Sequence, residues 1–237
     1  VFFGGAGMST ESGIPDFRSA RGLYTAQHDL PFPAEYMLSH SCLVEHPAEF
    51  FDFYRTYLVH PQARPNAGHR ALAALERAGQ VSTIITQNID GLHQISGVPP
   101  DRVIELHGTT RRAACLDCGA DAPLADIRSH FDIHGTAPDC AQCGGLVKTA
   151  TVSFGQPMPE QEMKRAQAAA LACDLMLVLG SSLTVYPAAG LPLAAKQLIQ
   201  QANDNGGRDN ISVILVHVLR TAQARMGFFA RLKNWFK

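Results

Sequence analysis

Apolar residues occur along the chain in short continuous runs, separated by amphipathic segments. The clearest run is DLMLVLG, residues 174–180, in which five consecutive aliphatic side chains precede a glycine. Such a run is typical of a parallel strand that is covered on both faces. The segments Val1–Phe3, VSTIIT at 81–86 and VIELHG at 103–108 have the same character. The pattern therefore predicts several short buried strands.

Helical periodicity lies between these runs. PNAGHRALAALERAG, residues 65–79, has the spacing of an amphipathic helix and ends at a glycine. Residues 19–63 are rich in aromatic residues, Pro and His, which predicts short helices and loops. Strands that alternate with helices predict an α/β fold with a Rossmann-like, doubly wound parallel sheet. The aromatic-rich region is then an inserted helical module.

Composition narrows the classes of protein that the chain can represent. Its 237 residues, of which 46% are hydrophobic, suffice for one large domain or one domain with inserted modules. The net charge of −1 provides no long-range field for a nucleic acid, so none is expected as a partner. No apolar run approaches the roughly 20 residues of a membrane span. The chain begins VFFGGAG, without Met or a signal peptide, and we expect a truncated start and a soluble, cytoplasmic protein.

Two cysteine pairs give the most specific chemical signal. Cys115-x-x-Cys118 and Cys140-x-x-Cys143 can place four thiolates around one ion, which predicts a closed, structural zinc site. Such a site requires reduced thiols and therefore favours a reducing compartment. The neighbouring His130 and His134 are interpreted as loop residues and not as ligands.

Two polar clusters follow predicted strands. After the first strand comes the turn GGAGMSTESG, which is typical of a phosphate-binding helix N-terminus, although Thr10 replaces the third glycine of G-x-G-x-x-G. A tight turn without a ligand is the alternative. After VSTIIT come Asn88, Asp90 and His93, and His107 stands near the end of VIELHG. Ligands of open α/β sheets bind at the carboxyl ends of the strands, but each residue taken singly also fits a structural role.

The order of these motifs resembles that of the sirtuins, the NAD-dependent protein-lysine deacylases. GAGMSTESGIPDFRS, TQNIDGLH, ELHG, the paired cysteines, SFGQ and GSSLTVYPAA occur in the sirtuin order between Val1 and Lys196. The resemblance implies a Rossmann-like NAD-binding domain of residues 1–19, 64–111 and 149–196. It also implies a helical module at 20–63 and a zinc module at 112–148. Residues 197–237 are left as an atypical tail, with a substitute strand at 211–218.

The resemblance also assigns site residues. It implies His107 and Asn88 as catalytic residues, with His107 as the base. The implied cofactor-binding residues are Gly5, Ala6, Gly7, Ser9, Ser12, Ile14, Asp16, Phe17, Arg18, Gln87, Asn88, Ile89, Asp90, Gly180, Ser181 and Ser182. The implied substrate-peptide residues, on two strands that sandwich the peptide, are Phe154, Gly155, Leu183, Thr184, Val185 and Tyr186.

The implied reaction is NAD-dependent removal of acetyl groups from lysines of a protein or peptide. The acyl oxygen attacks the ribose carbon of NAD, nicotinamide leaves, and His107 deprotonates a ribose hydroxyl. The products are free lysine, nicotinamide and O-acetyl-ADP-ribose. Two alternatives stay open: transfer of ADP-ribose to a protein, and an inactive remnant that binds only NAD or partners.

Three sequence features bear on the expected chemistry and substrate. Gly4 replaces the usual Thr before Gly-Ala-Gly, and Gln156 replaces the Glu of Phe-Gly-Glu; neither change removes the chemistry. Succinyl-specific sirtuins carry a Tyr and an Arg three residues apart. Here Tyr54 and Arg55 are adjacent and would point about 100° apart on a helix. We therefore expect acetyl-lysine as the substrate.

The tail, residues 197–237, departs most from the sirtuin pattern. QLIQQANDNGGRDNISVILVHV resembles the C-terminal stretch of metal-dependent serine/threonine phosphatases, with Asp209 and Asn210 at the metal-binding motif. One carboxylate cannot hold a two-metal site, so phosphatase activity is not expected. The usual ribose-binding carboxylate after the last strand is absent, which predicts NAD binding weaker by about 1 to 3 kcal/mol. The final residues MGFFARLKNWFK fit an ordinary terminal helix better than a helix on a membrane surface.

Overall fold

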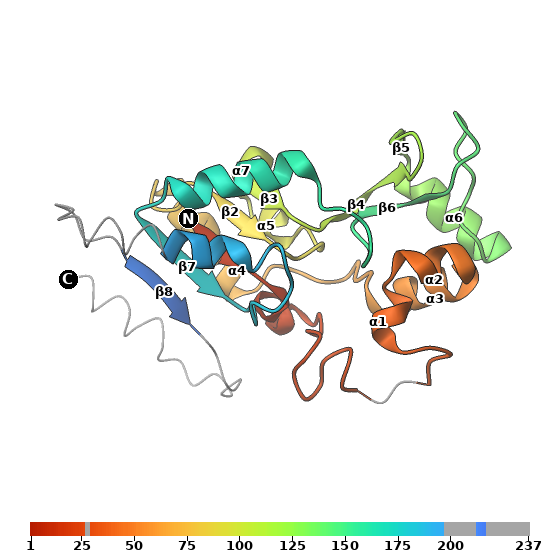
Figure 1. The fold of residues 1–237 in the computed structure, drawn as a ribbon, viewed down its shortest axis with the longest axis horizontal. Coiled ribbons are helices and arrows are strands. Elements are labelled where there is room, and N and C mark those ends of the chain that lie inside the picture. The colour runs from red at the N-terminus through yellow and green to blue at the C-terminus, as the bar shows by residue number, and fades with distance from the viewer. Residues whose placement is uncertain (27–28, 197–211, 217–237) are drawn as a thin grey trace.

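The larger sheet has five parallel strands in the order β3-β2-β1-β7-β8 (Figure 1). The computed structural model describes residues 1–26, 29–196 and 212–216. The strands are β1 Phe2–Gly4, β2 Ile84–Thr86, β3 Val103–Glu105, β7 Leu175–Leu179 and β8 Ser212–Val216. The predicted α/β class with a parallel sheet is confirmed. β2 and β3 are shorter than the apolar runs that predicted them, and Gly108 begins the next strand instead of ending β3.

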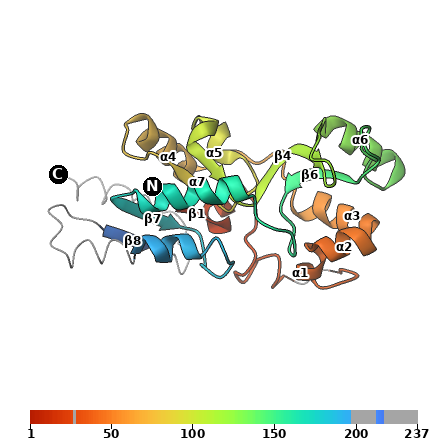
Figure 2. The same ribbon diagram turned by 45° about the horizontal axis from the view of Figure 1, so that its top comes forward.

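The sheet is covered on both faces because its side chains alternate between two hydrophobic clusters. Phe2 and its register partner Ile84 face one cluster with Leu72 of helix α4, which spans Ala67–Arg77. Phe3 and its partner Ile85 face the opposite cluster. That second cluster includes residues of α7 Glu160–Leu171 and of the helical segment 190–196. Figure 2 shows α4 and α7 on opposite sides of the sheet, which makes it doubly wound.

The described part of the predicted helical module, residues 20–26 and 29–63, contains three helices: α1 Ala34–Met37, α2 His40–Glu45 and α3 Pro47–Tyr57. Their buried residues, Phe50 and Phe53 among them, form a core separate from those of the sheet. Short helical elements also follow β1, as the 3-10 turns η1 Ala6–Met8 and η2 Thr10–Ser12. Two more connect β2 to β3, namely α5 Leu92–Ile95 and the 3-10 turn η3 Pro100–Arg102.

The cysteine pairs lie in a second, antiparallel sheet of order β5-β4-β6. Its strands are β4 Gly108–Cys115, β5 Asp121–Ala122 and β6 Val147–Thr151, and α6 Leu124–His134 packs beside them. The prediction that His130 and His134 lie in a loop is wrong, because both belong to α6. Figures 1 and 2 show this sheet and α1–α3 together at the end of the molecule away from β8, with β4 and β6 leading to it.

The end of the chain is described only in part. Residues 190–196 are helical, and β8 pairs in parallel with β7, Ser212 opposite Leu175 and Val216 opposite Leu179. β8 thus lies within the range where the sequence predicts a substitute strand. The phosphatase-like Asp209 and Asn210, the missing ribose carboxylate after the strand and the terminal aromatic segment lie outside the described residues.

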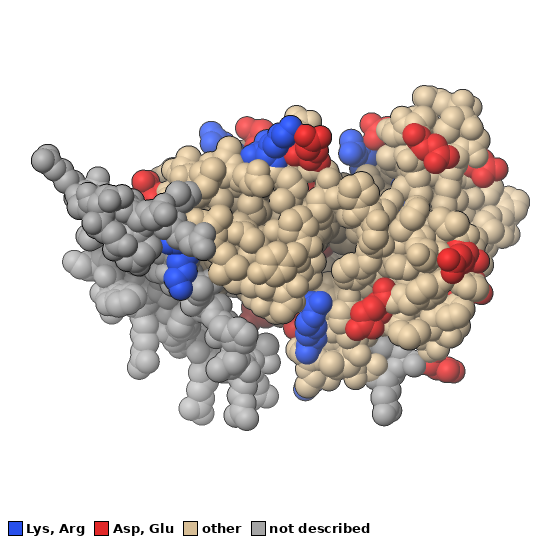
Figure 3. Space-filling view, in the orientation of Figure 1, with Lys and Arg blue, Asp and Glu red and all other residues tan. Residues whose placement is uncertain are grey.

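On the face shown in Figure 3, cationic and anionic side chains are scattered, and no extended basic area appears among the described residues. Within that same part of the chain, no helix has the length and apolar character needed to cross a membrane.

Candidate functional site

The turn after β1 brings three glycines into direct backbone contact. Gly7 N–H donates to the Gly180 carbonyl at 2.9 Å, and a Cβ on Gly5 would lie 2.7 Å from the same oxygen. Gly180 itself has a φ of 67° and lies against Met8. The family's Gly-Ala-Gly motif is therefore required here by close packing between the turn after β1 and the turn after β7.

This turn differs from the predicted entry into an α-helix. It continues as the 3-10 turns η1 and η2, because Met8 N–H bonds to Gly5 O and Ser9 N–H to Ala6 O, each three residues back. Within the described residues the Ala6 N–H has no acceptor. An unpaired N–H at the end of a parallel strand is a donor of the kind that a phosphate oxygen accepts, so the turn fits a phosphate group without an α-helix.

Ser9 connects the first turn to the loop after β2. Its hydroxyl donates to Asp90 Oδ2 at 2.6 Å and accepts from Asn88 Nδ2 at 3.0 Å. Ser9 and Asn88 are buried, and the other carboxylate oxygen of Asp90 accepts from Leu92 N–H at 2.9 Å. The structure thus joins three of the predicted site residues in one network.

His107 lies in the turn between β3 and β4 and is fixed by the same loop. Its Nδ1 is 2.9 Å from the Gln87 carbonyl oxygen. A carbonyl only accepts hydrogen bonds, so Nδ1 carries the proton and Nε2 keeps its lone pair. Burial lowers the pKa of His107, while the Gln87 hydrogen bond acts in the opposite direction. The side chain is therefore a neutral imidazole with a free basic nitrogen near pH 7.

The turn after β7 reaches the same loop through Gln87. Gln87 Nε2 donates to Ser181 Oγ at 2.8 Å, and Ser181 Oγ also accepts from Leu183 N–H at 3.2 Å. The neighbouring Ser182 is exposed and shares a hydrogen bond of 2.9 Å with Thr184. Gly180 and Ser181 thus lie beside the motif residues after β1 and β2, whereas Ser182 faces solvent.

Residues 14–18, which include four of the expected cofactor-binding residues, turn toward the helical module. Asp16 Oδ1 accepts from Ser19 N–H, and the Phe17 ring packs on Tyr24 with 5.3 Å between ring centroids. Arg18 also lies over Tyr24, at 5.3 Å from the ring centroid. Ile14 remains near the first turn, where its N–H donates to Ser9 O. Phe17 is partly buried against the helical-module core in this conformation.

The two segments predicted as peptide-binding strands are not strands here. Phe154 forms a single parallel bridge with Ser39, and the bonds that make it join Phe154 N–H to Leu38 O and His40 N–H to Phe154 O. Residues 183–186 bend, because Leu183 has a left-handed φ of 53°. Phe154 and Tyr186 nevertheless expose their aromatic side chains, at 44% and 67%.

The four cysteines converge as predicted. Their sulfur atoms all lie within 4.8 Å of one another, with 3.5 Å between Cys115 and Cys143 and 3.7 Å between Cys118 and Cys140. Tetrahedral zinc with Zn–S bonds of about 2.3 Å separates its sulfurs by about 3.8 Å. The four positions therefore fit one zinc ion. Since all four ligands come from the protein, the site is of the structural type.

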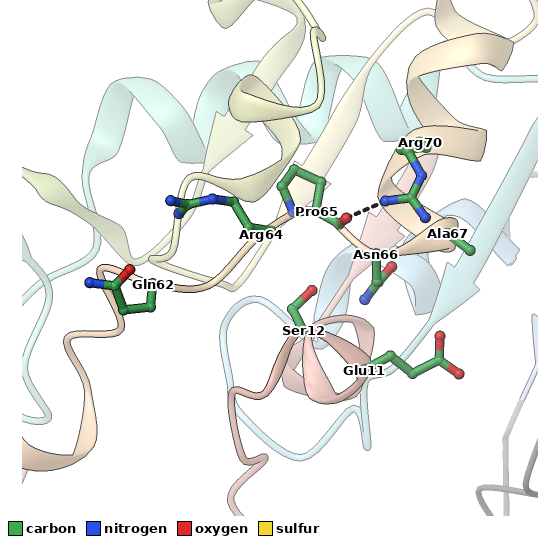
Figure 4. A pocket seen from close by; sticks show the side chains of 8 residues that line it. All are labelled: Glu11, Ser12, Gln62, Arg64, Pro65, Asn66, Ala67 and Arg70. Atoms are coloured by element: carbon green, nitrogen blue, oxygen red, sulfur yellow. Dashed lines mark hydrogen bonds between the residues drawn. The ribbon is translucent and has the colours of Figure 1, made fainter.

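The sequence did not reveal two residues that hold these loops. Asn66, the N-cap of α4, donates to Met8 O at 2.8 Å, and Thr110 donates to Ile89 O at 2.9 Å. Asn66 also lines a cavity of about 520 Å³ between η2 and the start of α4 (Figure 4). The residues around it are Glu11, Ser12, Gln62, Arg64, Pro65, Asn66, Ala67 and Arg70. Of the predicted site residues only Ser12 is among them, so this cavity is separate from His107. The helix start before Ala67 was the one signal available for Asn66.

Comparison with known proteins agrees with this geometry. The model of the Sir2 family matches residues 5–187. The NAD-dependent protein deacetylase of Cutibacterium acnes is 62% identical over 219 residues, with 92% of this chain and 87% of that protein covered. The NAD-dependent protein deacetylase 1 of Bradyrhizobium diazoefficiens is 51% identical, with 83% and 76% covered. Because 92% of 237 residues is more than the 196 that end at Lys196, the first alignment includes part of the tail.

Solved structures show the same fold. A Sir2 protein with a deacetylated p53 peptide and 3'-O-acetyl ADP-ribose superposes with a TM-score of 0.74 at 37% identity, covering 83% of this chain and 77% of that one. A Sir2 structure with a p53 peptide and NAD+ gives a TM-score of 0.71 at 37% identity, covering 83% and 76%. On the family match, the identities and the shared fold, the chain belongs to the Sir2 family.

Proposed function

We propose that this protein is an NAD-dependent protein-lysine deacetylase. The observation that carries the proposal is the position of His107. Its basic Nε2 is kept free by the Gln87 carbonyl, and the same loop carries the Asn88–Ser9–Asp90 network. A relative that is 62% identical over most of the chain is named as an NAD-dependent protein deacetylase. Its products would be nicotinamide, O-acetyl-ADP-ribose and the free lysine.

NAD would be held where the turns after β1, β2 and β7 meet. The Ala6 N–H supports binding of the diphosphate, and the Ser9-linked amide of Asn88 and carboxylate of Asp90 support binding of the ribose and nicotinamide. When bound, NAD supplies a ribose carbon whose bond to nicotinamide breaks and which accepts the acyl oxygen. The remaining residues that we assign to the cofactor are Gly5, Gly7, Ser12, Ile14, Asp16, Phe17, Arg18, Gln87, Ile89, Gly180, Ser181 and Ser182.

The protein's own contribution to the chemistry is a proton acceptor and its orientation. His107 Nε2 takes the proton of a ribose hydroxyl, while Nδ1–H stays bonded to Gln87 O and holds the ring. The lowered pKa of His107 keeps this nitrogen unprotonated near neutral pH. The peptide would lie against the segments around Phe154–Gly155 and Leu183–Tyr186, extending the Ser39–Phe154 bridge by β-augmentation.

The deciding experiment incubates the purified chain with an acetyl-lysine peptide and NAD. We expect loss of acetyl with one nicotinamide released per lysine, and a rate at least about 100-fold lower for His107→Ala. Labelled ADP-ribose attached to protein, without loss of acetyl, would favour an ADP-ribosyltransferase. If wild type and His107→Ala gave the same background, the inactive alternative would stand, and an NAD-dependent thermal shift would show whether cofactor binding survives.

We place the protein in the cytoplasm, since its cysteines are free and four of them form a thiolate site that needs reducing conditions. We also retain the phosphatase-like origin of the tail around Asp209 and the weaker NAD binding that it implies. The tail origin and the weaker NAD binding are inferred from the sequence alone.

A further inference from the structure

A buried lysine of β6 is connected to the catalytic base through the segment that follows it, and it takes no part in the chemistry proposed above. Lys148 of β6 is 2% exposed, and within the described residues it forms no ion pair. Its Nζ donates to Thr151 O, to Thr149 O at 3.3 Å and to Thr151 Oγ1 at 3.3 Å. These three acceptors match the three N–H bonds of an ammonium group, so its hydrogen-bonding capacity is filled without a carboxylate.

The location of Lys148 follows from an irregularity of the sheet. Gly108 pairs with Thr151, but the next pair joins Ala113 to Thr149, so residues 109–112 stand opposite Ala150 alone. Such a bulge interrupts the ladder, and buried carbonyls near an interruption need other donors. Lys148 donates to one carbonyl on either side of this interruption. The bulged segment also carries Thr110, which bonds to Ile89 of the loop after β2.

The residue that directly follows β6 is hydrogen-bonded to the backbone of the base. Val152 N–H donates to the His107 carbonyl at 2.9 Å, and a Cβ on Gly108 would collide with the Ala150 carbonyl oxygen. Tyr54 of α3 adds a bond from its buried hydroxyl to Thr151 Oγ1 at 3.0 Å. The segment then continues to Phe154. One short stretch therefore joins the lysine to the base and to a proposed peptide-binding residue.

We propose that Lys148 is a positioning residue, which holds the Thr151–Phe154 segment so that His107 and the acetyl-lysine peptide are aligned. This inference rests on the proposed deacetylase function. The ammonium acts as a bridge between carbonyls within one strand, and Tyr54 joins that bridge to the helical module. Burial lowers the pKa of Lys148 to about 8, which leaves the group protonated at pH 7.

The test compares Lys148→Met with wild type, with Lys164→Met as a matched control at an exposed lysine of α7. For Lys148→Met we expect the KM of the acetyl-lysine peptide to rise and kcat to fall, so that kcat/KM drops about 10- to 100-fold. The KM of NAD and the zinc content should stay as in wild type. Lys148→Arg, which keeps a donor cation, should recover part of the loss.

This pattern separates positioning from simple destabilisation. A partly unfolded enzyme loses active molecules, which lowers kcat and leaves both KM values unchanged. That result would overturn the inference, as would Lys148→Met activity within about threefold of wild type. If Lys148→Met fails to fold, Thr151→Val decides instead, because it removes one acceptor of Lys148 and keeps the side-chain shape. It should raise the peptide KM about threefold or more, and an unchanged KM would overturn the inference.

Peptide affinity is also measured without turnover, by fluorescence polarisation of a labelled acetyl-lysine peptide. A wild type that binds the peptide but does not deacetylate it would contradict the proposed function. Weaker binding by Lys148→Met in the same assay would still support the positioning role. A wild type that neither binds nor deacetylates the peptide would contradict both.

Discussion

The Ser9 hydroxyl donates a hydrogen bond of 2.6 Å to the Asp90 carboxylate, although 81 residues separate them in the chain. The same oxygen accepts from the Asn88 amide, so one buried hydroxyl sets the orientation of both residues. Ser9→Ala leaves the Asn88 amide and the Asp90 carboxylate without this partner. We expect NAD to bind about tenfold more weakly, because a lost buried hydrogen bond costs about 1 to 2 kcal/mol.

Calorimetric titration with NAD measures this effect. Ser96→Ala is the control, since the Ser96 hydroxyl donates only to the His93 carbonyl, at 2.7 Å, within α5 and its C-terminal turn. Equal NAD affinities of Ser9→Ala and Ser96→Ala would contradict the assignment of the Ser9 network to the cofactor.

Substitutions of Gln156 test whether the departure from the family's Phe-Gly-Glu affects peptide binding. Its Oε1 accepts from Ser153 N–H at 2.9 Å, and its own N–H donates to Ser153 O at 3.0 Å, which closes the turn after Phe154. Glutamate keeps an acceptor at this position, so Gln156→Glu should leave the peptide KM unchanged. Gln156→Met removes it, and the peptide KM should rise about fivefold for a loss of about 1 kcal/mol. Steady-state kinetics at saturating NAD distinguish the two; equal KM values for both variants would show that the turn does not depend on this bond.

Acyl selectivity follows from the directions of Tyr54 and Arg55. The Tyr54 hydroxyl is buried on Thr151, whereas Arg55 points outward, with bonds to Asp52 at 3.0 Å and Asp132 at 3.5 Å. This pair therefore presents no joint site for a substrate carboxylate. We expect kcat/KM for a succinyl-lysine peptide to be at least about 100-fold below that for the acetyl peptide, since an unpaired carboxylate would have to be desolvated. Comparable rates for the two peptides, measured by mass spectrometry, would contradict this.

The four-thiolate zinc site should be required for the stability of the fold. Its zinc ion should not exchange during catalysis. Wild type should contain one zinc per chain by elemental analysis. Cys118→Ser should lose the metal and lower Tm by about 10 °C, which corresponds to about 3 to 4 kcal/mol for a chain of this size. Cys173→Ser, at a partly buried cysteine outside the cluster, is the control. Retention of zinc and of Tm by Cys118→Ser would contradict a four-thiolate structural site.

Local sequence patterns predicted those parts of the fold that depend on local physics. The aliphatic run of β7, the amphipathic helix α4 and the spacing of the four cysteines each encode one element or one ligand set. Motif order supplied the site residues. The contacts between elements were not predictable in this way: Asn66 reaches Met8 across 58 residues, and Thr110 reaches Ile89 through a bulge that periodicity does not show. The burial of Lys148 likewise follows from pairing between β4 and β6, and a lysine in isolation is expected at the surface.

A pair of buried histidines, His69 and His93, makes stability depend on pH. Their ring centroids are 4.9 Å apart, and His93 also meets Phe2 edge to face at 5.9 Å. Both rings are fully buried, and neither nitrogen of His93 has a partner among the described residues. Burial, with a smaller effect of His69, lowers the pKa of His93 to about 3. Burial also lowers the pKa of His69. The charge of Asp90 raises this pKa, and the charge of Arg70 lowers it.

The folded protein therefore keeps His93 neutral at pH values where the unfolded chain protonates it. Stability that is fully present above about pH 6.5 is lost as pH falls toward 3, by about 1.4 kcal/mol per unit, or about 2 kcal/mol by pH 5. His93→Met fills the site without a titrating group, so its free energy of unfolding in urea should fall by about 2 kcal/mol less than that of wild type between pH 7 and pH 5. Protonation of the cysteine thiolates lowers the stability of wild type and of His93→Met equally, so it cancels when the two proteins are compared. His134→Met, at an exposed position of α6, should keep the wild-type pH dependence. If His93→Met loses as much stability as wild type over this range, the dependence arises elsewhere in the protein.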